Sequence, residues 1–382
     1  MTSQQTTPSA IATSPKPKTR SALNALWVIL AVTLTMAVVA AVVYYARTGA
    51  VSDRIRNPAV SGAPRPVHYL LGLSSSTWLT INQIGTIVAM SIVVAAFVIA
   101  WRRHPRHPVL LMVMVTTLIV WQDPIMNWAP YAVYNPQLWH WPEDWPLVSL
   151  SPTVEPFVVF GYAMFYATPY FPAIWILRRI QARRPVDSFV WRHPLICLAG
   201  LILVIGFIFD AFLEISMIRT GLYIYDQVIP FGSLFAGTPF QFPLLWESLS
   251  VTFVMIPAGV LVYRDDTGRT VAEKLAQRAR IFAGRPALGT FVVLFIILSA
   301  AYFFAYGGWF TVIKWTRTAT SVACPWPYPE AKVYDPQGFY EQNGQPGPYS
   351  VGIWSTWMSA QPHGRPNVTP PAGGGRCGAA HA

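Results

Sequence analysis

The sequence contains few charged residues. Asp, Glu, Lys and Arg make up only 11% of its 382 residues, whereas 53% are hydrophobic, and the mean hydropathy is +0.40. Ordinary soluble domains carry about 25% charged residues. The composition therefore argues against an ordinary soluble domain and favours a protein that has the lipid bilayer as its solvent.

Cysteine is also scarce. Three cysteines without a CxxC, CxxCH or Cys/His finger spacing exclude a disulfide scaffold and do not support a structural zinc site or a c-type haem. Cys197 lies in an apolar run and is interpreted as a small core residue. Cys324 and Cys377 both lie in the C-terminal tail, where they could form a disulfide if that tail is extracytoplasmic.

Several functional motifs are absent. The sequence has no P-loop, no GxGxxG and no GxSxG, which argues against nucleotide-driven transport and against a serine nucleophile. It has no HxxxH or ExxH pattern either, so we expect no metal and no cofactor. The net charge of +11 comes from short Lys and Arg clusters between apolar runs, without interleaved aromatic residues. Nucleic acid is therefore not an expected partner.

Long apolar segments dominate the remaining sequence. A membrane-spanning helix needs about 20 mainly apolar residues. The third such segment is expected to end in a broken or interfacial turn around Asp123 and Pro124. We predict an all-α, polytopic membrane helix bundle with about seven transmembrane helices. The segments are Ala25–Tyr45, Leu79–Trp101, Val109–Trp128, Pro156–Leu177, Pro194–Met217, Pro243–Tyr263 and Leu288–Ile313.

Basic residues predict the orientation of this bundle. Lys and Arg collect in cytoplasmic loops, and one set of alternate connections holds seventeen of them, against ten in the longer segments of the other set. The first set includes the N-terminal tail, so the N-terminus is expected inside and, with seven spans, the C-terminus outside. The expected location is the cell membrane, with multiple passes.

The segments outside the spans differ in composition. Residues 1–24 are expected to form a disordered cytoplasmic tail before the transmembrane domain of residues 25–313. The outer connection Gln122–Glu155 has no Lys or Arg but is rich in Trp, Tyr and Pro, which predicts an extended or turn-rich structure. Residues 314–361 repeat this composition and are expected to pack on the bundle as an irregular outer tail, followed by a disordered end, 362–382.

Carboxylates at membrane depth are candidates for a site, because ionisable groups are expensive there. Asp210 and Glu214 are four residues apart, which predicts that they share one face of the fifth span, in its outer third. Glu247 lies near the outer end of the sixth span, and Asp123 ends the third. These four are the candidate catalytic residues. The alternative is that they pair with basic side chains or backbone donors as structural groups, or face outer water.

Other polar and aromatic side chains are expected at the same depth, from the outer loop and from the outer ends of the second and fourth spans. An aromatic belt at the lipid headgroups is the alternative interpretation for those in the loop. The candidate substrate-binding residues are Asn127, Trp128, Tyr131, His140, Glu155, Asn82 and Gln83.

This group of residues suits acid and base chemistry. Two carboxylates held close in a low-dielectric pocket repel each other, so one is expected to keep its proton near neutral pH while its neighbour stays ionised. General acid and base catalysis needs both forms.

The stretch Trp121-Gln-Asp-Pro-Ile-Met-Asn-Trp, with the following Trp139-His-Trp, resembles the outer loop of the spirocyclase AveC family of actinobacterial integral membrane proteins. The segments Leu222-Tyr-Ile-Tyr and Tyr334-Asp-Pro-Gln-Gly-Phe-Tyr are similar in style and order. The resemblance implies an enzyme that closes a spiroketal in a lipophilic polyketide or lipid-like substrate, by cyclase and dehydratase chemistry. It assigns no catalytic residue, so the four carboxylates rest on their depth alone.

Two other functions fit the same residues. A transporter or lipid-handling membrane protein could use the carboxylates as a proton relay, although the inner halves of the spans carry no charges for a second gate. A non-catalytic scaffold for envelope or biosynthetic partners is the other alternative.

Overall fold

The computed structural model describes residues 69–123 and 162–324, together with Met36, Met126, residues 130–135 and Leu138. Within these residues, four helices are long and apolar enough to cross a membrane. The all-α membrane helix bundle predicted from the sequence is therefore confirmed. The four helices are α3 (Ser75–Arg103), α9 (Pro194–Arg219), α10 (Leu244–Leu261) and a continuous helix from Pro286 to Thr316.

The continuous helix has three parts. It begins as α12 (Pro286–Ala301), passes through the π-helical segment η5 (Tyr302–Gly308) and ends as α13 (Trp309–Thr316). A π-helical segment adds a residue to a turn and often occurs at functional sites. Here it brings the buried side chains of Tyr302 and Tyr306 into the centre of the bundle.

The third and fourth predicted spans are interrupted. The third is α4 (Pro108–Leu118), which tightens into the 3₁₀ turn η2 (Ile119–Gln122), as expected for a broken outer end. In the fourth, residues 162–165 are helical, residues 166–169 form a turn, and α7 (Tyr170–Gln181) follows. Pro169 lies in that turn, where it cannot donate a helical hydrogen bond. The first predicted span, 25–45, lies outside the described residues except for Met36.

Among the described residues, three short antiparallel ribbons accompany the helices. The first joins β1 (Tyr69–Leu70) to β2 (Leu73–Ser74). The second joins β3 (Ala132–Tyr134), from the predicted outer loop, to β4 (Tyr223–Tyr225), with Tyr134 opposite Tyr223. The third joins β5 (Gln227–Val228) to β6 (Ser321–Val322), the start of the predicted outer tail. The loop and the tail are thus tied to the chain that follows α9.

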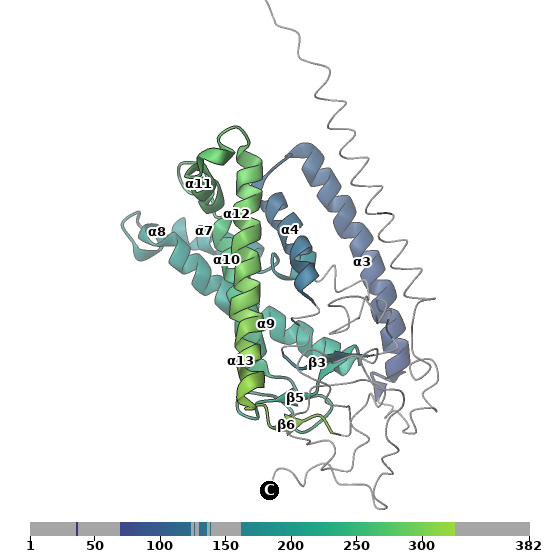
Figure 1. Cartoon of the computed structure of the whole chain (residues 1–382). Coiled ribbons are helices and arrows are strands. Elements are labelled where there is room, and N and C mark those ends of the chain that lie inside the picture. The colour runs from purple at the N-terminus through teal and green to yellow at the C-terminus, as the bar shows by residue number, and fades with distance from the viewer. Residues whose placement is uncertain are drawn as a thin grey trace, which may run out of the picture.

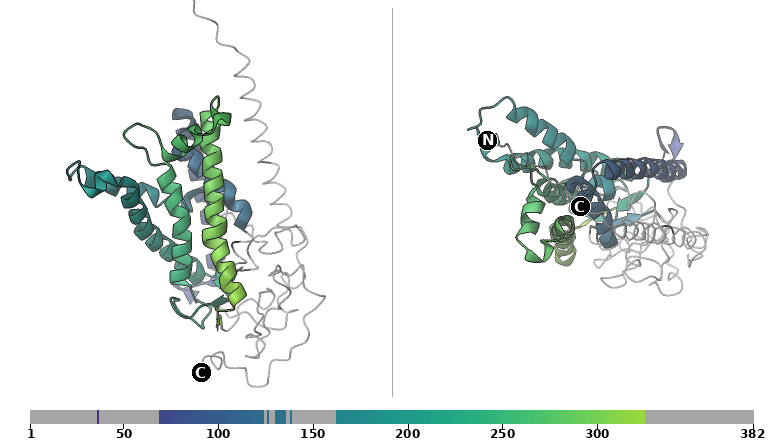
Figure 2. Two further views of the ribbon diagram at one scale, coloured as in Figure 1. Left: turned by 60° about the vertical axis from the view of Figure 1, so that its left-hand side comes forward. Right: turned by 90° about the horizontal axis from the view of Figure 1, so that it is seen from above.

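The ribbons β3–β4 and β5–β6 lie at one end of the bundle, called here the ribbon end (Figure 1). The short helices α8 (Phe189–Arg192) and α11 (Val271–Gln277) lie at the opposite end, called here the basic end. The 3₁₀ turn η4 (Arg280–Phe282) connects α11 to α12. Helix α10 packs against α9, α12 and η5 at the centre, and α3 stands at the periphery (Figure 2).

Glycine permits the close approach of α9 and α10. A Cβ atom built on Gly259 of α10 would lie 2.3 Å from Cδ1 of Ile202 and 3.2 Å from Cδ2 of Tyr170. Gly200, on α9, has no atom within 4 Å of such a position. The two glycines therefore differ in packing, although both lie inside membrane-length helices.

We expect Gly259→Ala to lower the free energy of unfolding by about 1–3 kcal/mol, because the methyl group overpacks this contact. Gly200→Ala is the matched control and should leave stability equal or slightly higher, since alanine favours the helix by up to about 1 kcal/mol. Denaturant unfolding of both variants in detergent micelles measures the difference. Equal stabilities would contradict the close approach.

Candidate functional site

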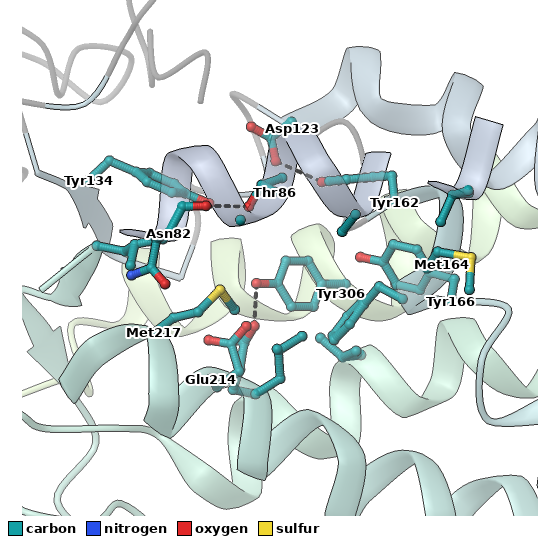
Figure 3. A pocket seen from close by; sticks show the side chains of 18 of the residues that line it. Asn82, Thr86, Asp123, Tyr134, Tyr162, Met164, Tyr166, Glu214, Met217 and Tyr306 are labelled. Carbon is teal, nitrogen blue, oxygen red and sulfur yellow. Dashed lines mark hydrogen bonds between the residues drawn. The ribbon is translucent and has the colours of Figure 1, made fainter. Parts of the chain in front are cut away.

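A cavity of about 530 Å³ lies among α3, α9, α10 and η5, and its lining extends to Tyr134 of β3 at the ribbon end (Figure 3). Three of the four predicted carboxylates line it, together with five tyrosines. Helix α3 supplies a wall of apolar and small residues. The lining residues are Ile81, Asn82, Gly85, Thr86, Ala89, Val93, Asp123, Tyr134, Tyr162, Met164, Phe165, Tyr166, Leu213, Glu214, Met217, Leu222, Glu247, Val251, Tyr302 and Tyr306.

Asp210 and Glu214 share the buried face of α9, as their spacing predicted. Glu214 lines the cavity, whereas Asp210 does not. The buried stripe of α9 repeats every four residues, and each such step turns the side chain by about 40° and lifts it by about 6 Å. Asp210 is consequently fully buried beside Ser248 of α10. Within the described part of the chain, neither of its carboxyl oxygens accepts a hydrogen bond.

Glu214 is held by two tyrosines of β4. The hydroxyl groups of Tyr223 and Tyr225 both donate to Oε2 of Glu214, the second at 2.9 Å. Alternate residues of a strand point to the same side, and a turn at Gly221, with φ at 80°, returns β4 toward the end of α9. Burial, followed by the nearby charge of Glu214, raises the pKa of Tyr225 well above its usual value. Tyr225 therefore remains a neutral donor.

Glu247 lies in the first turn of α10 and is 2% exposed. Its Oε1 accepts a hydrogen bond of 2.6 Å from the hydroxyl of Tyr306. Its Oε2 is buried and has no hydrogen-bond partner among the residues described. A buried oxygen without a hydrogen-bond donor costs free energy. A bound molecule would therefore gain most binding free energy by donating a hydrogen bond to this oxygen.

A group of tyrosines connects the two sides of the cavity. Asp123 accepts a hydrogen bond of 2.8 Å from Tyr162, whose hydroxyl also hydrogen-bonds that of Tyr302. The rings of Tyr302 and Tyr306 stack with their centroids 5.5 Å apart. The series therefore runs from Asp123 to Glu247 through hydroxyl groups and one ring contact.

The predicted substrate-binding residues do not all lie at the cavity. Asn82 lines the cavity and donates to the hydroxyl of Thr220 at 3.1 Å. Gln83 is half-buried, and its amide donates to the carbonyl oxygen of Leu79. Tyr131 is buried beneath the ammonium group of Lys314 rather than at the cavity. Asn127, Trp128, His140 and Glu155 lie outside the described residues.

The tyrosines that line the cavity and those that hold Glu214 were not among the sequence candidates. The sequence contains most of these tyrosines as regularly spaced pairs. Tyr162 and Tyr166 are four residues apart, as are Tyr302 and Tyr306, and Tyr223 and Tyr225 are two residues apart. Such pairs also occur in ordinary cores and interfacial belts, which is why spacing alone did not single them out.

Two further predictions concern the pairing of the cysteines and the presence of a metal site. Cys324 is disulfide-bonded and Cys197 is free; Cys377 lies outside the described residues, so its pairing with Cys324 stays a prediction. Across the described ranges, no group of three or more His, Cys, Asp or Glu side chains is placed to hold a metal ion. The polar side chains that line the cavity are carboxyl, phenol, hydroxyl and amide groups.

Comparison with known proteins gives one match. The family model described as spirocyclase AveC-like matches residues 101–334, a stretch that contains Asp123, Asp210, Glu214 and Glu247. No curated protein and no solved structure matches the chain.

Proposed function

The chain belongs to the AveC-like spirocyclase family, and from this premise we propose that it is a membrane-embedded acid/base enzyme that forms spiroketals. The observation that carries the proposal is the cavity lined by three carboxylates and five tyrosines. We propose a lipophilic polyketide or a lipid-like keto-diol as the substrate.

For this reaction the protein has to supply only proton transfers and the stabilisation of one positive charge. One hydroxyl of a dihydroxy ketone adds to the carbonyl carbon and gives a hemiketal. Protonation of the new hydroxyl lets it leave as water, which produces an oxocarbenium ion. The second hydroxyl then adds to that ion and loses its proton, so a keto-diol becomes a spiroketal and one water. An acid, a base and an anionic neighbour are sufficient for these steps.

Glu247 is proposed as the group that transfers protons. Its Oε2 is free of hydrogen bonds among the described residues, while Tyr306 holds Oε1 in place. Glu214, with Tyr223 and Tyr225 on one oxygen, is proposed to stabilise the positive charge of the oxocarbenium ion. Asp123 and its partner Tyr162 line the other side and would hold a substrate hydroxyl. Asp210 would act through its two acidic neighbours, since it does not reach the cavity.

The wall formed by α3 supports a lipophilic substrate. Leu79 is the only buried residue of this membrane-length helix. The α3 residues at the cavity include Ile81, Gly85, Ala89 and Val93, which offer no hydrogen-bonding side chain. An apolar chain could thus lie along α3 while the reacting oxygens meet the carboxylates.

The test is turnover by the purified chain in lipid nanodiscs. A long-chain keto-diol whose spiroketal has two separable stereoisomers is supplied, and the products are resolved by chiral chromatography. We expect one stereoisomer to form in excess over the mixture obtained with empty nanodiscs. The same mixture and the same rate in both samples would refute the proposed function.

The carboxylates at the cavity would also suit a proton relay in a transporter. Alternating access would need a second set of polar gates. Every buried Asp, Glu or Lys among the described residues lies in the half of the bundle toward the ribbon end or in its ribbons: Asp123, Asp210, Glu214, Asp226, Glu247 and Lys314. This one-sided distribution favours the enzyme. Proton-coupled uptake into proteoliposomes would favour the transporter instead.

We expect Tyr306→Phe to lower kcat for spiroketal formation by about 10- to 100-fold. The change removes one hydrogen bond to a carboxylate, which is worth about 1.5–3 kcal/mol, and leaves the ring stack in place. Tyr263→Phe is the matched control, because Tyr263 is equally buried but lies at the basic end, under the guanidinium group of Arg178. Equal rates for the two variants would show that the Tyr306 hydroxyl does not support Glu247.

A further inference from the structure

A second cavity, of about 460 Å³, lies at the basic end of the bundle and shares no residue with the carboxylate cavity. The end of α8 and the start of α9 form one part of its lining, and the segment after α10 together with α11 forms the other. Its lining residues are Arg192, His193, Pro194, Leu195, Ile196, Tyr263, Asp265, Arg269, Val271, Lys274, Leu275 and Arg278.

The lining of this cavity is strongly cationic. Lys274 forms an ion pair with Asp265, and the hydrogen bond from Lys274 lowers the pKa of Asp265 to about 2, so that this pair is neutral overall. Arg192, Arg269 and Arg278 remain, and none of them forms an ion pair with a residue that the structure describes. Arg269 donates instead to the side chain of Gln277 at 2.7 Å. Within the described part of the chain, these three guanidinium groups therefore have no carboxylate partner.

The start of α9 adds backbone donors to the same cavity. Its N-cap residue, His193, makes no side-chain hydrogen bond to the first turn, and Pro194 follows as the first helical residue. The peptide N–H groups of Leu195 and Ile196 come next, and both residues line the cavity. The first N–H groups of a helix, together with the positive end of its dipole, favour an anion. In this cavity, the first N–H groups of α9 therefore add to the attraction that the arginines exert on an anion.

The cavity also has an apolar side. Leu195, Ile196, Val271 and Leu275 line it beside the arginines. Ile196 is 61% exposed at the start of a helix of membrane-spanning length, where lipid chains would cover it. A small inorganic anion would leave this apolar side unused. A phospholipid, whose phosphate is joined to acyl chains, complements both sides.

From these contacts we infer that the cavity is a binding site for the phosphate headgroup of an anionic phospholipid. Arg192 ends α8, directly before α9, and Arg278 directly follows α11, so two separate segments of the chain supply the arginines that would bind the phosphate. The acyl chains lie against Leu195 and Ile196. Such a lipid would tie α11 to α9 at the level of the headgroups.

The full chain purified in detergent tests this inference by native mass spectrometry. Phosphatidylglycerol and phosphatidylcholine of equal chain length are titrated separately. We expect phosphatidylglycerol to bind more tightly, and R192A/R278A to weaken its binding about 25-fold, because each basic residue near an anionic lipid contributes about a factor of five. Binding of phosphatidylcholine should change little.

The matched control is R183A/R184A, which removes the same charge from exposed positions between α7 and α8 that do not line the cavity. It should bind phosphatidylglycerol as the unmodified chain does. An equal loss in both double variants, equal binding of the two lipids, or displacement of the lipid by equimolar inorganic phosphate would overturn the inference. Should R192A/R278A fail to fold, R278A alone, at an exposed position, is expected to weaken binding about fivefold.

Discussion

Glu247→Gln is expected to lower kcat for spiroketal formation by about 10²- to 10⁴-fold, the usual contribution of a general acid or base. Glutamine keeps the size of the side chain, and its carbonyl oxygen can still accept the hydrogen bond from Tyr306. What it loses is the ability to give and take a proton at the position of Oε2. KM should change little, because the shape of the cavity is kept. The measurement is steady-state turnover of the keto-diol in nanodiscs.

Glu273→Gln is the matched control for this variant. Glu273 completes a capping box with Thr270 at the start of α11, at the basic end, and glutamine serves equally well in that motif. The control should retain full activity and stability. If E247Q turns over the keto-diol as fast as E273Q, Glu247 does not transfer protons and the proposed role passes to another carboxylate.

Lys314→Met is expected to lower the free energy of unfolding by about 3–5 kcal/mol, the usual cost of breaking a buried charge pair. Lys314 and Asp226 are each 1% exposed and interact electrostatically. The ammonium nitrogen also lies 4.0 Å from the centre of the Tyr131 ring. Methionine fills the same space but leaves Asp226 buried without its countercharge. Unfolding in detergent, followed by tryptophan fluorescence, measures the loss.

A double variant separates the charge pair from simple packing. D226N/K314M removes both charges, so it should recover a large part of the stability that K314M loses. Lys274→Met is the control for an exposed pair, and its effect should be small because solvent screens the interaction with Asp265. A double variant that is no more stable than K314M would show that the two charges do not stabilise each other.

The same pair matters for the candidate site. Asp226 directly follows Tyr225, its peptide N–H donates to the carbonyl oxygen of Tyr131 at 2.9 Å, and its own carbonyl oxygen accepts from the N–H of Ala323 at 2.9 Å. These bonds hold β4 between the two outer segments. We therefore expect K314M to reduce activity as well, through the position of the tyrosines on Glu214.

Local patterns were sufficient for some features of the site. The four-residue spacing of Asp210 and Glu214 predicted their shared face, because a helix has about 3.6 residues per turn. The place of Glu247 in the first turn of its helix followed from its position near one end of the sixth apolar segment. In both cases the information lies within one helix, so no knowledge of its neighbours was needed.

Other features depend on contacts between distant segments. The i, i+4 spacing could not show that Asp210 packs against α10 while Glu214 faces a cavity, because the choice depends on where α10 lies. The tyrosines that hold Glu214 and Glu247 come from β4 and η5, and the pairing of β3 with β4 joins residues about 90 positions apart. Periodicity does not encode such distant partners.

The sequence by itself determined that the protein is an all-α membrane bundle, because the lack of charge and the length of the apolar runs restrict a chain in lipid to helices that satisfy their own backbone. It also predicted ionisable side chains at one depth. The tertiary structure alone decided which of them meet. Packing of α10 against α9, the π-helical segment and the ribbons brought Asp123, Glu214 and Glu247 to one cavity and kept Asp210 behind it, since side-chain direction in a bundle is set by neighbouring helices rather than by spacing along one of them.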